Sequence, residues 1–324
     1  MSSSAPSWKR DLEEHGFAIV RGVVTPERAS EYVAAAHTWA GQFGWSAEDR
    51  STWNTAHLPA GAAGVVSNYG TAHEKWVWEA RMEPKIAEAF AEVWGTDELI
   101  VSFDVVNFSV PVGPHARTDI VPTPPWPHCD QQPRPSNRPH FEFELAQGLL
   151  ALSPSGPTDG GLVVLKGSHK LVKRYLDDHD GYKPGQDWGE SNYYTFTEAD
   201  IEWFHKQPGC TEIKVETEAG DLVLWDSRTI HWNRVPTGDI VRNAVYVCMC
   251  PKSMASAELL DKRKEYFEKR LATSHWPAPY LVGTREAFGA DLRDGKEDHL
   301  DHPRPLEEPV VTKRMLQLVG CEPY

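Results

Sequence analysis

Three side chains that can bind a metal ion are spaced as one site would require. His128 and Asp130 are two positions apart in the run Trp-Pro-His-Cys-Asp that ends at Asp130. On a β-strand such a pair points to one face, because strand side chains alternate with a period of two. A distant His231 would add a second imidazole. Two histidines and one carboxylate leave coordination positions open and suit a non-haem Fe(II) centre that activates dioxygen.

An arginine completes the set. Arg242 stands eleven residues after His231, at the start of an apolar run. If these segments form neighbouring strands, the guanidinium can lie at the back of the same pocket and hold a dicarboxylate cosubstrate through a bidentate pair. A lone His-x-Asp is weak evidence, and His299 with Asp301 is a second example without useful partners. The ordered set of four residues is the stronger signal.

The chain resembles the phytanoyl-CoA dioxygenase family of Fe(II)- and 2-oxoglutarate-dependent oxygenases. The resemblance rests on His128-x-Asp130, on His231 with Arg242, and on the segment 160–170, which begins Gly-Gly-Leu-Val-Val-Leu. Within that segment Lys166 stands where the family usually has proline. A weaker likeness at the amino terminus extends the resemblance over residues 10–250.

The resemblance implies a mostly β fold with flanking helices and a double-stranded β-helix (jelly-roll, cupin-like) core. A barrel of this size with helical flanks is commonly one unit, so we expect a single domain over residues 1–324. The core would span about 99–250, between a helical flank at 1–98 and a carboxyl-terminal helix and tail at 251–324. The implied reaction oxidises a bound organic substrate with dioxygen while 2-oxoglutarate is decarboxylated to succinate and CO2.

Other polar residues are candidates for holding 2-oxoglutarate. Gln147 shares a face with neighbouring apolar residues that points inward by the family's register, and the alternative is a structural amide bonded to backbone. Asn233 stands where the family often has a hydroxyl residue. In the predicted strand 99–110, Asp104 or Asn107 could face the pocket, and the alternative for both is a local hydrogen bond. His169 belongs in the family to a turn, and we exclude it as a ligand.

The segment 172–210 is rich in aromatic and acidic residues, Tyr182 and Trp188 among them. An insertion of this kind between barrel strands predicts a cap over the open side of the iron, where it would shape the substrate pocket and exclude water. The alternative is an outer layer that only shields the sheet.

Composition limits the partners. A net charge of −14 opposes binding to nucleic acid and to anionic membranes, and it weighs against a coenzyme A thioester. The odd count of five cysteines favours reduced thiols, and no stretch has the length and apolarity of a membrane span or a signal sequence. We therefore expect a cytoplasmic monomer or homodimer that acts on a small molecule, such as an amino acid or a secondary metabolite.

Two other functions remain open. A cupin-like isomerase or hydrolase with another divalent metal would work without dioxygen and would leave Arg242 without a cosubstrate. A non-catalytic small-molecule-binding relative would bind iron without responding to 2-oxoglutarate. Within the oxygenase hypothesis, Asp130 as a ligand favours hydroxylation or desaturation over halogenation, because a halogenase needs that ligand position for halide.

Overall fold

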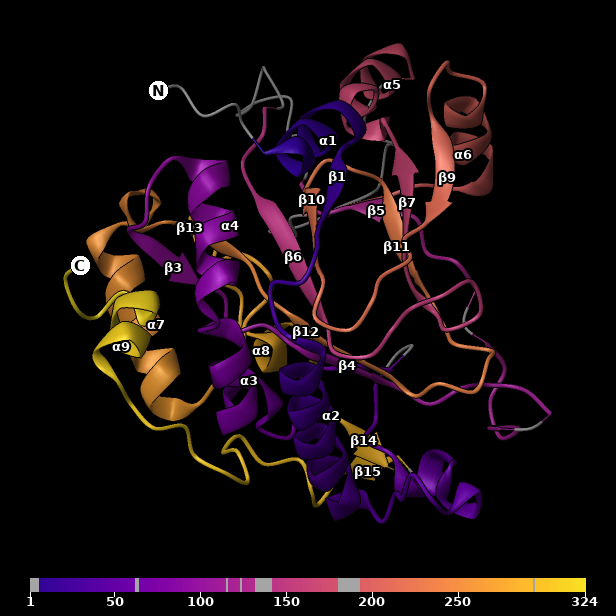
Figure 1. Cartoon of the computed structure of the whole chain (residues 1–324), viewed down its shortest axis with the longest axis vertical. Coiled ribbons are helices and arrows are strands. Elements are labelled where there is room, and N and C mark those ends of the chain that lie inside the picture. Colours follow the sequence, from indigo (N-terminus) through magenta and orange to yellow (C-terminus); the bar gives the residue numbers. More distant parts are fainter. Residues whose placement is uncertain are drawn as a thin grey trace.

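The computed structural model describes residues 6–61, 64–114, 116–122, 124–131, 142–179, 193–293 and 295–324. Within them, two antiparallel sheets face each other and form a barrel (Figure 1). The major sheet has the order β1 (Phe17–Val20), β10 (Leu222–Asp226), β6 (Ala146–Ala151), β12 (Arg242–Tyr246), β4 (Val106–Ser109) and β2 (Val65–Val66). The minor sheet has the order β8 (Tyr194–Thr195), β5 (His128–Cys129), β11 (His231–Arg234), β7 (Gly161–Lys166) and β9 (Thr211–Lys214). This architecture confirms the expected double-stranded β-helix.

The inner faces of the two sheets meet in an apolar core. Directly paired residues on neighbouring strands share a face of the sheet. Leu149 pairs with Val223 on one side and with Tyr246 on the other, so all three point inward. On the minor sheet, Val164 pairs with His231, which places an imidazole on the same inner face. The buried apolar members of this core are Leu149, Ala151, Leu162, Val164, Val215, Val223, Trp225 and Ala244.

Helices cover the outer face of the major sheet. They are α1 (Ser7–His15), α2 (Pro26–Ala40), α3 (Lys75–Arg81), α4 (Pro84–Trp94), α7 (Ala257–Lys269) and α9 (Lys313–Val319). The start of α2 follows from its sequence, because the Thr25 hydroxyl accepts a hydrogen bond from the Arg28 amide and Pro26 fits the first turn. Among the residues that the structure describes, no helix combines the length and the apolarity needed to cross a membrane.

The expected strand 99–110 is two strands. β3 (Leu99–Val101) pairs with β13 (Met249–Pro251), whereas β4 belongs to the major sheet. The polar residues between them have specific partners: the Ser102 hydroxyl accepts a hydrogen bond from the Cys248 amide, and the Asp104 carbonyl accepts one from Arg81. These hydrogen bonds take the place of the backbone hydrogen bonds that a continuous strand would have made with a neighbouring strand.

The carboxyl-terminal segment packs back onto the barrel. Helix α7 ends at Lys269, because Arg270 adopts a left-handed conformation (φ 58°). Arg263 of α7 is fully buried, and its guanidinium donates hydrogen bonds to the carbonyls of Val101, Pro277 and Val319. The short elements α8 (Thr284–Phe288), β14 (Leu292–Arg293) and β15 (Lys296–Glu297) complete this region.

The described residues of the segment 172–210 lie on the outside of the barrel, whereas the cap stays a prediction, because residues 180–192 lie outside the described residues. Helices α5 (Val172–Asp178) and α6 (Glu198–His205) pack beside β7 and β9 (Figure 1), on the outer face of the minor sheet. Their apolar residues share a cluster with outward-facing residues of the sheet, among them Cys129, Val163 and Trp232. This is the shielding role. Tyr182 and Trp188 lie outside the described residues.

The shielding layer gives a stability prediction. Phe204 of α6 has no exposed surface and packs against Phe196 and Tyr175. Replacing Phe204 with alanine is expected to lower the free energy of unfolding by about 3–5 kcal/mol, the usual cost of truncating a buried phenylalanine. Denaturant unfolding measures this. Iron affinity should stay unchanged, and a variant of full stability with altered iron binding would show that α6 acts at the site instead.

Candidate metal centre

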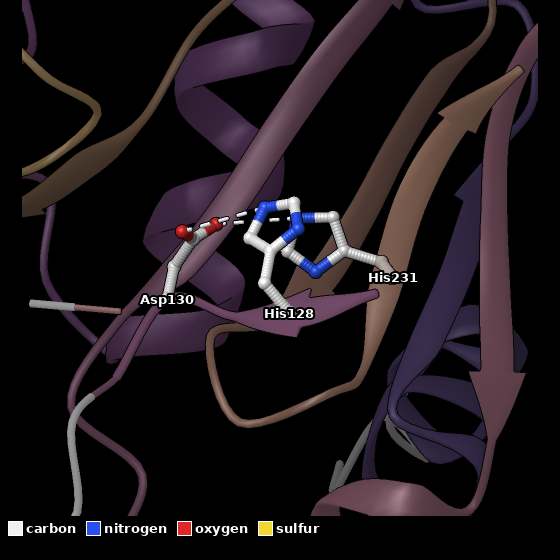
Figure 2. A group of neighbouring side chains, drawn as sticks. All are labelled: His128, Asp130 and His231. Atoms are coloured by element: carbon white, nitrogen blue, oxygen red, sulfur yellow. Dashed lines mark ion pairs between the residues drawn. The ribbon is translucent and has the colours of Figure 1, made fainter. Parts of the chain in front are cut away.

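Strands β5 and β11 bring the three candidate ligands together. His128 and His231 are direct partners on these two antiparallel strands, and Asp130 follows β5 immediately. One potential ligand atom from each residue lies within 4.8 Å of the others. The Asp130 carboxylate is 3.1 Å from Nε2 of His231 and 3.7 Å from Nε2 of His128. Figure 2 shows the two rings and the carboxylate pointing toward one another, which is the arrangement that the sequence predicted.

Backbone carbonyls set the orientation of both rings. Nδ1 of His128 lies 2.8 Å from the Trp126 carbonyl, and Nδ1 of His231 lies 2.9 Å from the Thr229 carbonyl. A carbonyl only accepts, so each Nδ1 carries the proton and each Nε2 keeps its lone pair. Those lone pairs are the ones that face Asp130. Metal-bound histidines commonly have this support, and the donor set therefore fits a divalent ion.

The charges suit a cation as well. Burial, together with the neighbouring His231, lowers the pKa of His128 to about 4, so the ring is neutral at pH 7. Burial acts to raise the pKa of Asp130, but His275, His128 and His231 outweigh it and hold that pKa well below its usual range. The ionised carboxylate of Asp130 is a buried negative charge that a divalent cation held beside the two imidazoles would compensate.

Gln147 supports the carboxylate. Its Nε2 donates a hydrogen bond of 2.7 Å to Oδ2 of Asp130. The Trp276 indole donates to the Asp130 carbonyl at 3.3 Å, and the Asp130 amide donates to the Ser227 carbonyl at 2.8 Å. The sequence offered Gln147 either as a cosubstrate donor or as an amide bonded to backbone. The structure shows a third arrangement, in which Gln147 orients a candidate metal ligand.

This contact gives a testable prediction. Replacing Gln147 with leucine is expected to weaken Fe(II) binding by about 10- to 100-fold, the usual effect of removing a hydrogen bond to a metal ligand. Anaerobic titration with Fe(II) measures it. Gln207, whose side chain bonds to the Trp203 carbonyl of α6 and to Arg174 of α5, is the matched control as Gln207→Leu. Equal iron affinity in both variants would contradict the role of Gln147.

Arg242 lies inside the barrel with an unused donor. Arg242 is 3% exposed. Its Nη1 is buried and has no hydrogen-bond partner among the residues that the structure describes. A small cavity of about 10 Å³ adjoins it, lined by residues of both sheets such as Leu149 and Leu162. A buried guanidinium with one unsatisfied donor is costly, so the site fits an anionic ligand.

The assumed strand order around Arg242 was wrong. Strand β11 pairs with β5 and β7, whereas β12 pairs with β4 and β6 in the other sheet. Arg242 therefore approaches the barrel interior from the major sheet, and His231 from the minor sheet. The sequence could not reveal this, because strand partners are not determined by chain order.

The remaining cosubstrate candidates lie on inner faces. Asn107 pairs with Ala244 and is 2% exposed, and its side-chain oxygen accepts a hydrogen bond from the Ser109 hydroxyl at 2.8 Å. A local hydrogen bond of this kind was the alternative interpretation for Asn107. Asn233 is two residues beyond His231 on β11 and so points to the same side. Tyr246, four positions after Arg242, shares the inner face and was missed.

Two further residues border the triad. Trp126 is 52% exposed and stacks on His128 with ring centroids 4.2 Å apart, and Tyr193 contacts it edge-on at 5.5 Å. His275 lies 4.0 Å from Asp130 and was not predicted. By contrast, His169 is bonded to the Glu13 carbonyl at 3.2 Å and stays outside the site, as expected.

Comparison with known proteins identifies the family. The model of the phytanoyl-CoA dioxygenase (PhyH) family matches residues 12–237. The chain belongs to this family. The match includes the three candidate metal ligands and ends shortly before Arg242.

A relative and two solved structures are similar over most of the chain. The "Ava biosynthesis cluster protein O" of Aspergillus versicolor is 39% identical over 279 residues, which are 85% of this chain and 87% of that protein. The structure of "GlcNAc Inducible Gene 2, GIG2 (DUF1479)" from Candida albicans covers 98% of this chain and 76% of its own, with 14% identity and a TM-score of 0.63. The epimerase SnoN, solved "in complex with Fe3+, alpha ketoglutarate and nogalamycin RO", covers 95% of both chains with 18% identity and a TM-score of 0.50. At these identities the two structures support the fold.

Proposed function

We propose that this protein is an Fe(II)- and 2-oxoglutarate-dependent oxygenase. Its reaction hydroxylates, desaturates or closes a ring in a small organic molecule and releases succinate and CO2. His128, Asp130 and His231 would hold the iron, and Arg242 would pair with the distal carboxylate of 2-oxoglutarate. Bound iron supplies the activation of dioxygen. Asn107 and Asn233 stay predictions as further contacts of the cosubstrate.

One observation carries the proposal. A triad with both Nε2 lone pairs turned inward shares a barrel with a buried guanidinium that has an unused donor. The triad alone would also suit a cupin-like isomerase or hydrolase. That alternative, like a non-catalytic relative, gives no reason to bury the charge of Arg242, because no anionic cosubstrate takes part.

We infer the substrate class from the name of the related Aspergillus versicolor protein. That protein's name places it in a biosynthesis cluster, and we infer that this chain also acts on a small metabolite. The acidic net charge agrees with a substrate that is not itself strongly anionic. A cytoplasmic location and a monomeric or dimeric state remain predictions.

Stimulated turnover tests the proposal. The protein is loaded with Fe(II) and 2-oxoglutarate without oxygen, then exposed to dioxygen with fractions of a fungal metabolite extract while succinate is measured. We expect at least one fraction to raise succinate release above the substrate-free rate, and its product to need dioxygen. Product formation under strictly anaerobic conditions would support the isomerase or hydrolase instead.

A further inference from the structure

A third imidazole faces the triad from the carboxyl-terminal segment. Nε2 of His275 lies 4.0 Å from Oδ1 of Asp130, which is too long for a hydrogen bond. This nitrogen is buried and has no hydrogen-bond partner in the described part of the chain. Such a donor or acceptor is costly to leave unused, so a partner supplied by a ligand would account for it.

The position of His275 is fixed by its neighbours. The Thr273 amide donates to the Phe103 carbonyl at 2.8 Å, and the Thr273 hydroxyl accepts from the Phe103 amide at 3.1 Å. The Trp276 indole donates to the Asp130 carbonyl at 3.3 Å. The residues before and after His275 are thus bonded to the barrel, and the imidazole is held beside the candidate metal ligand.

His275 is more exposed than the three candidate metal ligands. Its side chain is 23% exposed, compared with 14% for His128, 10% for Asp130 and 7% for His231. His275 and His128 are therefore the most exposed of these four side chains. The exposed ring of Trp126 stacks on His128 and offers a flat apolar surface beside it.

A second acidic side chain, Asp104, lies near His275. Asp104 is 5% exposed, interacts electrostatically with His275 and Asp130, and accepts a hydrogen bond at Oδ1 from the Val105 amide. Arg81 bonds to the Asp104 carbonyl rather than to its carboxylate. Burial raises the pKa of Asp104, so the ionised carboxylate beside His275 is that of Asp130, and it disfavours a second anion there.

We propose that His275 binds the substrate, through a hydrogen bond to a neutral or cationic molecule that carries an N–H or O–H group. The inference rests on the proposed oxygenase function and adds the recognition of the substrate. It makes the carboxyl-terminal segment, which lies beyond the family match at residues 12–237, a part of the active site.

Paramagnetic relaxation with small probes tests this assignment. The full chain is loaded with Mn(II) and saturating 2-oxoglutarate, and the proton line widths of phenol, anisole and benzoate are measured. Anisole has a methyl group in place of the hydroxyl hydrogen of phenol and cannot donate, and benzoate carries a negative charge. We expect phenol to be broadened about fivefold more than either of the others. His275→Phe should reduce phenol to the level of anisole, and His275→Gln should restore part of the difference.

The controls distinguish substrate binding by His275 from an effect on metal or 2-oxoglutarate binding. His299, whose side chain is 83% exposed, is the matched control as His299→Phe and should behave like the wild type. His275→Phe should also retain its Mn(II) and 2-oxoglutarate affinities. Phenol broadening equal to that of anisole in the wild type, or unchanged in His275→Phe, would overturn the proposal, as would lost metal affinity in that variant. A wild type that binds no 2-oxoglutarate would instead contradict the proposed function itself.

Discussion

Replacing Asp130 with alanine is expected to abolish succinate formation that depends on substrate. The carboxylate is the only anionic group of the triad, and Gln147 holds it toward both imidazoles. Removing a hydrogen bond to a metal ligand already costs about 10- to 100-fold, so loss of the ligand should lower activity and Fe(II) affinity by more than about 100-fold. Succinate release and anaerobic iron titration measure the two effects.

A matched aspartate provides the control. Asp239 has a side chain that is 82% exposed and forms a surface ion pair with Arg50. Asp239→Ala should retain full activity, because such surface pairs contribute little. If Asp130→Ala kept activity at the level of Asp239→Ala, the assignment of the triad would be wrong.

Replacing Arg242 with methionine is expected to weaken 2-oxoglutarate binding by about 30-fold or more. Truncating one partner of a buried charge pair costs about 2–5 kcal/mol, and each 1.4 kcal/mol corresponds to a factor of ten. Fe(II) affinity should stay unchanged, because Arg242 is not among the candidate ligands. Lysine at this position should give an intermediate affinity, since it keeps the charge but loses the bidentate geometry.

Thermal unfolding distinguishes a loss of 2-oxoglutarate binding from a loss of stability in the Arg242→Met variant. In the ligand-free protein the methionine removes a buried charge whose Nη1 has no partner among the described residues, so the melting temperature should not fall. The stabilisation that 2-oxoglutarate gives the wild type should disappear. Arg234→Met is the control, because Arg234 is 45% exposed and pairs with Glu212. Equal stabilisation of both variants by 2-oxoglutarate would exclude Arg242 as the cosubstrate residue.

The sequence predicted most of the ligand geometry. The period of two in a strand was enough to place His128 and Asp130 together, and the family resemblance implied the barrel that the structure confirms. Helix α2 was also predictable, because its capping threonine and first-turn proline act locally. Features that depend on local geometry could therefore be inferred from the chain alone.

Features that depend on contacts between distant segments could not. Packing against β5, β7 and β11 decides which side of the sheet α5 and α6 cover. The sequence does not reveal that side, because a segment rich in aromatic residues suits either a cap or a shielding layer. His275 stands 145 positions after Asp130 in the numbering of the chain, and nothing in its neighbourhood forms a recognisable motif. The only available signal was the aromatic run His-Trp after a helix, which does not indicate a site.

Anaerobic titration of the wild type tests the central claim most directly. The protein would be given Fe(II) and then 2-oxoglutarate while its visible absorption is recorded, with Asp130→Ala and Arg242→Met in parallel. We predict one Fe(II) per chain and an absorption change that saturates with 2-oxoglutarate in the wild type only. Tight iron binding with no spectral response to 2-oxoglutarate would contradict the account and support a non-catalytic or cupin-like protein.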